Sequence, residues 1–66
     1  MVEVNQQNLK LAMINNGATQ ASISKAAKIE SARLSRLLKN GGKCYFDTAR
    51  RLASALNVPP ENIFWL

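Results

Sequence analysis

The stretch from Thr19 to Lys39 constrains the fold most, because it predicts two short helices joined by a tight corner. In the second helix, residues 31–39, the leucines at 34, 37 and 38 have the i, i+3, i+4 spacing of one buried helix face. The positions left outside are small or cationic. A chain that buries the leucines must therefore present cations to solvent along the same helix.

Cap and turn residues divide the rest of the chain into further short helices. Asn5 can cap a first helix that ends before Gly17, and Thr19 can cap the second. The Asn-Gly-Gly break at 40–42 precedes a fourth helix, and Pro60 can open a fifth. No segment shows a strand pattern, and residues 1–4 are expected to form an arm. The sequence predicts an all-α fold, a compact bundle of five short helices, over about 6–16, 20–27, 31–39, 46–56 and a short segment from 60.

Apolar residues recur at helical spacing on the first and fourth helices. The first helix has one apolar row at Leu9, Ala12 and Met13 and a second at Leu11 and Ile14. The predicted buried stripe of the fourth helix is Phe46, Ala49, Leu52, Ala53 and Leu56, with Arg50, Arg51 and Ser54 outside.

Length and charge narrow the class of protein. The 66 residues suit a single domain, 1–66, with no room for a second. The net charge is +5, and residues 25–51 hold eight of the nine basic residues with only two acids. Such a concentrated positive field points to a polyanion, nucleic acid or an anionic membrane surface. A basic face that only aids solubility is the alternative.

Several functions are disfavoured because the chain lacks the residues that they require. With no His and one Cys, Cys44, we expect no metal site, no cofactor and no disulfide. No nucleophile–base couple, carboxylate pair or phosphate loop supports an enzyme or a small-molecule substrate. Cys44 is expected to be a small filler, with redox sensing the alternative. No apolar run or leader pattern suggests a membrane, so a cytoplasmic location is expected.

The order and spacing of several motifs resemble the Cro and phage-repressor (XRE) helix-turn-helix family. The resemblance runs from Leu9 to about Phe64 and rests on Thr19-Gln20, Ile23-Ser24, the corner residue Ile29, Leu34-Ser35-Arg36-Leu37, Asn40-Gly41 and Arg51 to Val58. It implies a lambda-repressor-like fold with the helix-turn-helix at about 19–39. It also implies sequence-specific binding of double-stranded DNA, with helix 31–39 in the major groove, as in a small Cro-like repressor of phage or mobile-element origin.

The sequence departs from the family pattern in three ways, at two single positions and at one pair of positions. Lys28 stands where the family prefers glycine, and Glu30 stands where Ser or Thr usually caps the recognition helix; Ser31 is the alternative cap. Met13 and Leu38 stand where many members bury an Arg–Glu pair. Because both partners are apolar here, we expect Met13 and Leu38 to touch in the core.

Candidate DNA contacts follow from the outer face of helix 31–39 and its surroundings. Arg36 can pair bidentately with guanine, and short neighbours permit close approach. The expected base contacts are Ser31, Ala32, Ser35 and Arg36. The expected phosphate contacts are Gln20, for which the resemblance implies this role, Arg33 and Lys39 toward the edges of the helix, and Asn40 and Lys43 in the following loop.

The apolar C-terminus suggests a second subunit. A small domain makes few base contacts, so a homodimer on a near-palindromic operator is expected. Residues 58–66 are the candidate contact, with the dimer interface assigned to Ile63, Phe64, Trp65 and Leu66. The alternative function is a protein-interaction module such as an antitoxin or antirepressor. The outer face of helix 31–39 carries cations rather than aromatic residues, and this favours DNA over a protein partner.

Overall fold

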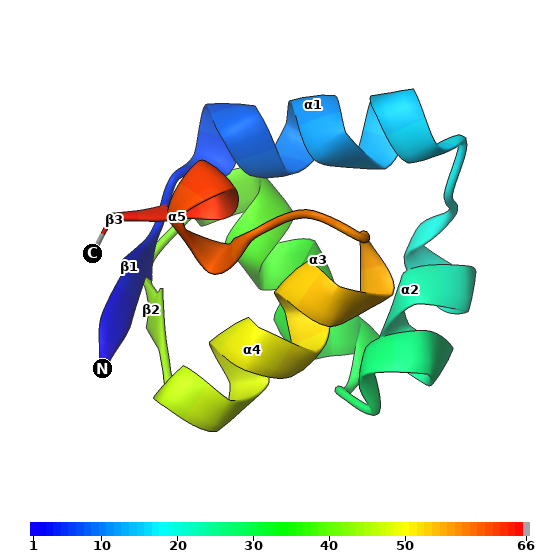
Figure 1. The fold of residues 1–66 in the computed structure, drawn as a ribbon. Helices are drawn as coiled ribbons and strands as arrows, with labels where there is room; N and C mark the ends of the chain where they lie inside the picture. The colour runs from blue at the N-terminus through cyan, green and yellow to red at the C-terminus, as the bar shows by residue number, and fades with distance from the viewer. Residues whose placement is uncertain (66) are drawn as a thin grey trace.

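Five short helices and a small sheet make up the computed structural model, which describes residues 1–65 (Figure 1). The helices are α1 (Gln6–Asn16), α2 (Gln20–Ala27), α3 (Ser31–Asn40), α4 (Phe46–Ala55) and α5 (Pro60–Ile63), and the strands are β1 (Val2–Val4), β2 (Lys43–Cys44) and β3 (Phe64–Trp65). The prediction of five short helices is confirmed, and the predicted ends of α1 to α4 lie within one residue of those observed.

Local capping explains where the first two helices begin and end. Asn5 Oδ1 accepts a hydrogen bond from the N–H of Asn8 at 3.3 Å, and Gly17 closes α1 at φ 63°. Thr19 and Ser22 cap α2 reciprocally: each side-chain oxygen accepts from the other residue's N–H, at 3.1 and 3.2 Å. Both helices therefore begin where the cap pattern predicts.

The three strands form an antiparallel sheet in the order β2-β1-β3, so the expectation of no strands is wrong. Residues 2–4 are the central strand rather than an arm. Val2 lies opposite Cys44 and Val4 opposite Phe64, and both valines point into the core. Two- and three-residue strands are too short to show an alternating pattern, and their partners come from distant parts of the chain.

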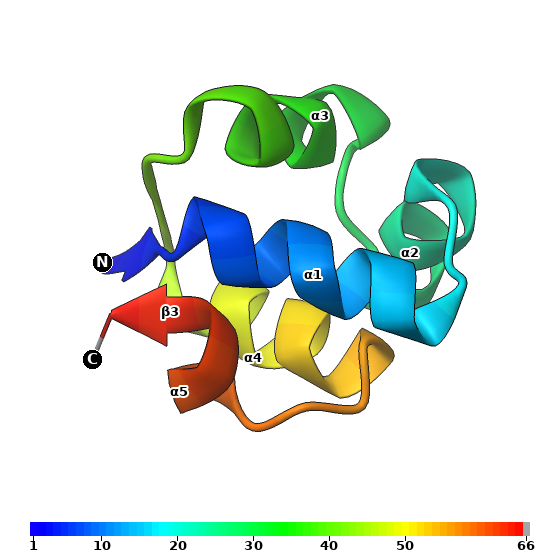
Figure 2. The ribbon, with the colours of Figure 1, turned by 90° about the horizontal axis from the view of Figure 1, so that it is seen from above.

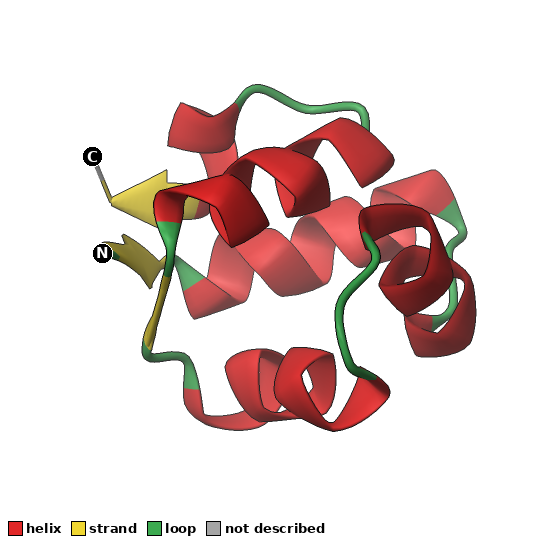
Figure 3. Ribbon diagram, turned by 90° about the horizontal axis from the view of Figure 1, so that it is seen from below, coloured by secondary structure: helices red, strands yellow, loops and turns green. Residues whose placement is uncertain are grey.

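The core lies where α1 crosses between α3 on one side and α4 with α5 on the other (Figure 2). The sheet closes one end of the molecule, away from the corner between α2 and α3 (Figure 3). Met13 on α1 and Leu38 on α3 are both buried. The two helices pack against each other. The buried apolar residues are Val2, Val4, Leu9, Ala12, Met13, Ile23, Ala27, Leu34, Leu37, Leu38, Cys44, Ala49, Leu52, Ala53, Leu56, Ile63 and Phe64.

Three large apolar residues of α1 and α4 are exposed, and for one of them, Phe46, the predicted burial is wrong. Leu11 and Ile14 lie on the outer side of α1, because the row of Leu9, Ala12 and Met13 takes the inner side. Phe46 begins α4 and is 68% exposed, because the buried face of that helix starts at Thr48. On a short helix, the spacing of apolar residues alone thus does not determine which of them are buried.

The corner between α2 and α3 depends on an unusual backbone conformation. Lys28 closes α2 at φ 56° and ψ 47°, in the left-handed region that glycine adopts without cost. Its N–H and that of Ile29 bond back to the last turn of α2, and Ile29 packs partly buried against the core. The corner therefore takes the geometry expected of the motif although a side chain is present.

Replacing Lys28 with glycine should stabilise the fold. Lys28→Gly removes the steric cost of the left-handed conformation and should raise the free energy of unfolding by about 0.5–1 kcal/mol. Urea denaturation measures this change. Asn57→Gly is the matched control, because Asn57 also has a positive φ, 57°, but asparagine tolerates it better. An equal gain in both variants, or none at Lys28, would contradict this account.

Candidate nucleic-acid interface

The outer face of α3 gathers small and cationic side chains. Leu34, Leu37 and Leu38 are buried, so the rest of the helix faces solvent. Ser35 is half-buried at the margin of this face. The exposed residues are Ser31, Ala32, Arg33, Arg36, Lys39 and Asn40. The structure thus brings the four predicted base contacts together on one surface.

Arg36 lies near the middle of this face. It shares one line along the helix with Ala32 and Lys39, at the i, i+4 and i+7 spacing, while Arg33 lies on a flank. Lys39 is therefore at the end of the helix rather than at its side. Within residues 1–65 neither Arg36 nor Lys39 takes part in an ion pair. Both charges are available to an external anion.

Helix α3 begins without a side-chain cap. Glu30 occupies the N-cap position but accepts no hydrogen bond from the helix, and Ser31 is the first helical residue. The alternative of Ser31 as cap is therefore wrong. The first N–H groups of a helix lack intrahelical partners and carry its positive dipole end. The start of α3 can thus receive an anionic or acceptor atom.

Gln20 is exposed at the first position of α2. The capping box uses the N–H groups of Thr19 and Ser22, so it leaves those of Gln20 and Ala21 without a side-chain cap. Side chain and backbone at this point can both donate to one anion.

Asn40 and Lys43 flank the two-glycine loop after α3, and both are exposed. Gly41 and Gly42 have φ of 70° and 105°, which carry the chain from α3 into β2. Lys43 lies opposite Glu3 across the β1–β2 pair, so a carboxylate is its nearest cross-strand neighbour. Lys43 is thus a weaker candidate anion contact than the cations of α3.

Gln6 holds the C-terminal end of α3, and this contact was not found from the sequence. Its Nε2 donates to the carbonyl oxygen of Leu38 at 2.8 Å and also to that of Lys39. The last four carbonyls of a helix need such donors from outside. A half-buried side chain of α1 therefore fixes the C-terminal end of α3.

The C-terminal residues divide between core and surface, which corrects the predicted dimer interface. Ile63 and Phe64 are buried within the single chain, at 0% and 2% exposure, and are not available to a second subunit. Trp65 is 62% exposed on β3. The prediction for Leu66 lies outside the described residues.

Other chemistry finds little support in the described part of the chain. Residues 1–65 contain no group of three or more His, Cys, Asp or Glu side chains placed to hold a metal ion. Burial raises the pKa of the Cys44 thiol, against a smaller lowering by the charges of Arg33 and the N-terminus. The thiolate, which is the reactive form, is therefore scarce near neutral pH.

Among the described helices, none is both long and apolar enough to span a bilayer.

Comparison with known proteins gives a family match and a structural match. Residues 8–65 match the sequence model of the Cro/C1-type helix-turn-helix DNA-binding domain. The fold is similar to that of the restriction-modification controller protein C.AhdI from Aeromonas hydrophila, with a TM-score of 0.79 and 16% identity over 86% of each chain. At this identity the likeness shows a shared fold alone. Among curated protein sequences, none matches this chain.

Substitution of Gln6 should weaken the attachment of α3 to α1. Gln6→Ala leaves two carbonyls of α3 without their donor and should lower the free energy of unfolding by about 1 kcal/mol. Gln6→Glu should cost more, because a carboxylate would face these carbonyls and the negative end of the helix dipole. Urea denaturation compares both with Gln7→Ala, an exposed neighbour. If Gln6→Ala is as stable as Gln7→Ala, the contact contributes nothing.

Proposed function

The chain belongs to the Cro/C1-type helix-turn-helix family of DNA-binding transcription regulators, and we propose that it reads double-stranded DNA with α3 in the major groove. The observation that carries this proposal is the exposed, unpaired Arg36 near the middle of the α3 face. A guanidinium can donate two hydrogen bonds to O6 and N7 of guanine. The major groove is wide enough to admit one helix.

The residues around Arg36 permit a close approach to the bases. Ser31, Ala32 and Ser35 are short, so the backbone of α3 can lie near the floor of the groove. Ala32 can contact a thymine methyl group, and the serine hydroxyls can donate to or accept from base edges. Exposed cations without aromatics on this face favour DNA over a protein partner.

Phosphate contacts at the margins set the position of α3 along the groove. Gln20 presents its side chain and uncapped N–H groups at the start of α2, as a phosphate requires. On the other side, Asn40 and Lys43 flank the loop after α3. Arg33 on the flank and Lys39 at the end of α3 complete the set. Such contacts raise affinity and fix register but carry no sequence information.

We propose a small Cro-like repressor of phage or mobile-element origin that binds as a homodimer to a near-palindromic operator. The Cα trace measures 25 × 21 × 20 Å, so two adjacent copies can present their α3 helices about 34 Å apart, one turn of DNA. The exposed Trp65 lies on β3, at an edge of the sheet where no further strand of residues 1–65 pairs with it. This edge is the proposed subunit contact.

Loss of Arg36 should remove discrimination at one base pair. On a duplex selected from a random library, Arg36→Ala should lose about 1–3 kcal/mol of preference for the selected base. Fluorescence anisotropy with every single-base variant of the duplex measures this change. Lys10→Ala removes the same charge from α1, outside the proposed interface, and should keep the preference. Equal weakening on every duplex in Arg36→Ala would make Arg36 a phosphate contact.

Removing the exposed aromatic from β3 should weaken the dimer. Trp65→Ser should shift the protein toward monomer in sedimentation equilibrium and weaken binding to the palindromic duplex in parallel. The control is Ile14→Ser on the outer side of α1, where an apolar side chain is 72% exposed. If Ile14→Ser dissociates the dimer and Trp65→Ser does not, the subunits meet through α1 and the proposal for β3 fails.

A further inference from the structure

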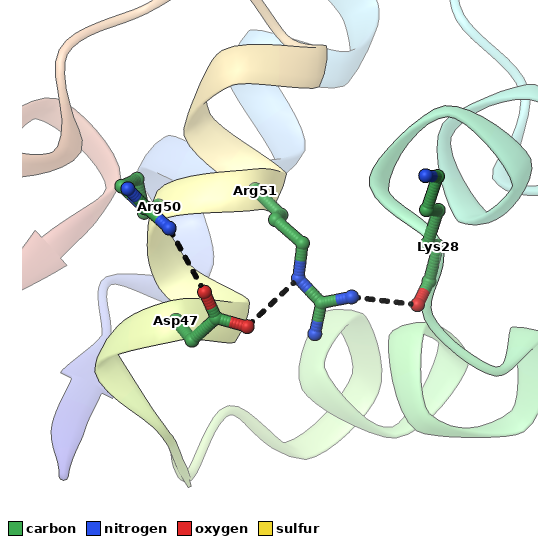
Figure 4. A network of polar contacts seen from close by, with 4 residues as sticks. All are labelled: Lys28, Asp47, Arg50 and Arg51. Atoms are coloured by element: carbon green, nitrogen blue, oxygen red, sulfur yellow. Dashed lines mark hydrogen bonds and ion pairs between the residues drawn. The ribbon is translucent and has the colours of Figure 1, made fainter.

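A polar network joins α4 to the corner that precedes the recognition helix (Figure 4). Arg51 Nη1 donates to the carbonyl oxygen of Lys28 at 3.1 Å. Arg51 Nε lies 3.3 Å from Asp47 Oδ2, one turn earlier on α4. We refer to Asp47, Arg51 and the Lys28 carbonyl as the corner bridge. The sequence places Arg51 outside, but the side chain instead lies across from α4 to α2.

The surroundings of Arg51 differ from those of its neighbour. The Arg51 side chain is 37% exposed and that of Arg50 is 79% exposed, although both pair with Asp47. Arg51 Nε is shielded from solvent and makes no well-aligned hydrogen bond, so Asp47 holds it through charge. Arg51 and Lys28 together line two shallow grooves, one beside Ala26 and Ser54 and the other beside Glu30 and Arg33. The corner bridge thus lies between these grooves.

Besides the backbone hydrogen bonds of Lys28 and Ile29 to α2, the corner has few contacts that fix its direction. Lys28 holds a left-handed conformation that is strained for a side-chain residue, and Glu30 supplies no cap to α3. Ile29 is only partly buried. At the C-terminal end of α2, a cation that donates to the last carbonyl is favoured by both the hydrogen bond and the helix dipole.

We propose that Arg51 is a positioning residue for DNA recognition, which fixes the corner and thereby the direction in which α3 presents Arg36. The inference rests on the proposed function of α3 in the major groove. It assigns to a residue of α4 an effect on base discrimination without contact to DNA. Arg50 shares Asp47 but, within residues 1–65, makes no hydrogen bond or ion pair with the corner, so it should have no such effect.

The test compares Arg51→Ala with Arg50→Ala on the selected duplex and on a scrambled duplex of the same composition. The two variants remove the same charge from adjacent positions. Arg51→Ala should reduce the ratio of the two affinities by about three- to tenfold, the effect of losing one hydrogen bond of typical strength. Arg50→Ala should keep the ratio, and Arg51→Lys should restore part of it because an ammonium can still donate to the Lys28 carbonyl.

Salt dependence separates positioning from phosphate contact. If Arg51 acts through the corner, the slope of log affinity against log salt in Arg51→Ala should equal that in Arg50→Ala. A slope smaller by about 1 in Arg51→Ala alone would mean that Arg51 neutralises a phosphate, and would overturn the proposal. An unchanged affinity ratio in Arg51→Ala would overturn it as well. Should Arg51→Ala fail to fold, Arg51→Gln and Arg51→Lys provide the same comparison.

Two further measurements distinguish failure of this inference from failure of the proposed function. In the DNA-free protein, ¹H–¹⁵N spectra of Arg51→Ala should show shifted amides at Ile29, Glu30 and Ser31, while Arg50→Ala should leave them in place. Unshifted amides would contradict the corner bridge whatever the protein binds. If instead Arg36→Ala keeps its full base preference while Arg51→Ala shifts the corner amides, the role of α3 fails and the corner bridge stands as a structural contact only.

Discussion

Burial of the leucine face of α3 is the interaction on which the rest of the structure depends. Leu34, Leu37 and Leu38 enter the core against α1 and α2, and each buried leucine contributes about 1.5–3 kcal/mol. Because the three side chains lie on one side of a ten-residue helix, their burial fixes which side remains outside. The small and cationic residues acquire their common surface as a consequence of this packing.

Hydrophobic packing sets the rotation of α3 about its axis, and polar contacts fix its two ends. Gln6 of α1 holds the carbonyls of the last turn, while Arg51 of α4 holds the corner before the first turn. Both contacts supply donors to backbone carbonyl oxygens that have no hydrogen-bond partner within a helix. The outer face of α3 therefore makes none of these structural contacts and remains available to bind a partner.

The sequence predicts the helices well because their ends are determined locally. Asn5, Thr19 and Gly17 each act on residues within one turn, so a cap pattern is enough to place them. Lys28 shows the limit of a family preference, since the corner keeps its left-handed geometry without glycine.

The sheet, the C-terminus and the long-range polar contacts could not be predicted, because each depends on residues far apart in the chain. Gln6 and Leu38 are 32 positions apart, and Arg51 and Lys28 are 23 apart, with no periodic signal to connect them. Ile63 and Phe64 are buried where β3 pairs with β1, which only the assembled fold reveals. For the same reason, the surface row of α1 could not be told from its buried row.

If α3 enters the major groove with Arg36 on a guanine edge, the bound protein should shield guanine N7. Dimethyl sulfate methylates guanine N7 in that groove, so its reaction with the selected duplex measures this shielding. We expect one guanine in each half-site that the wild-type protein protects and that Arg36→Ala, at saturating concentration, leaves reactive. Guanine N7 atoms that stay reactive under the bound wild-type protein, or that stay protected under Arg36→Ala, would contradict it.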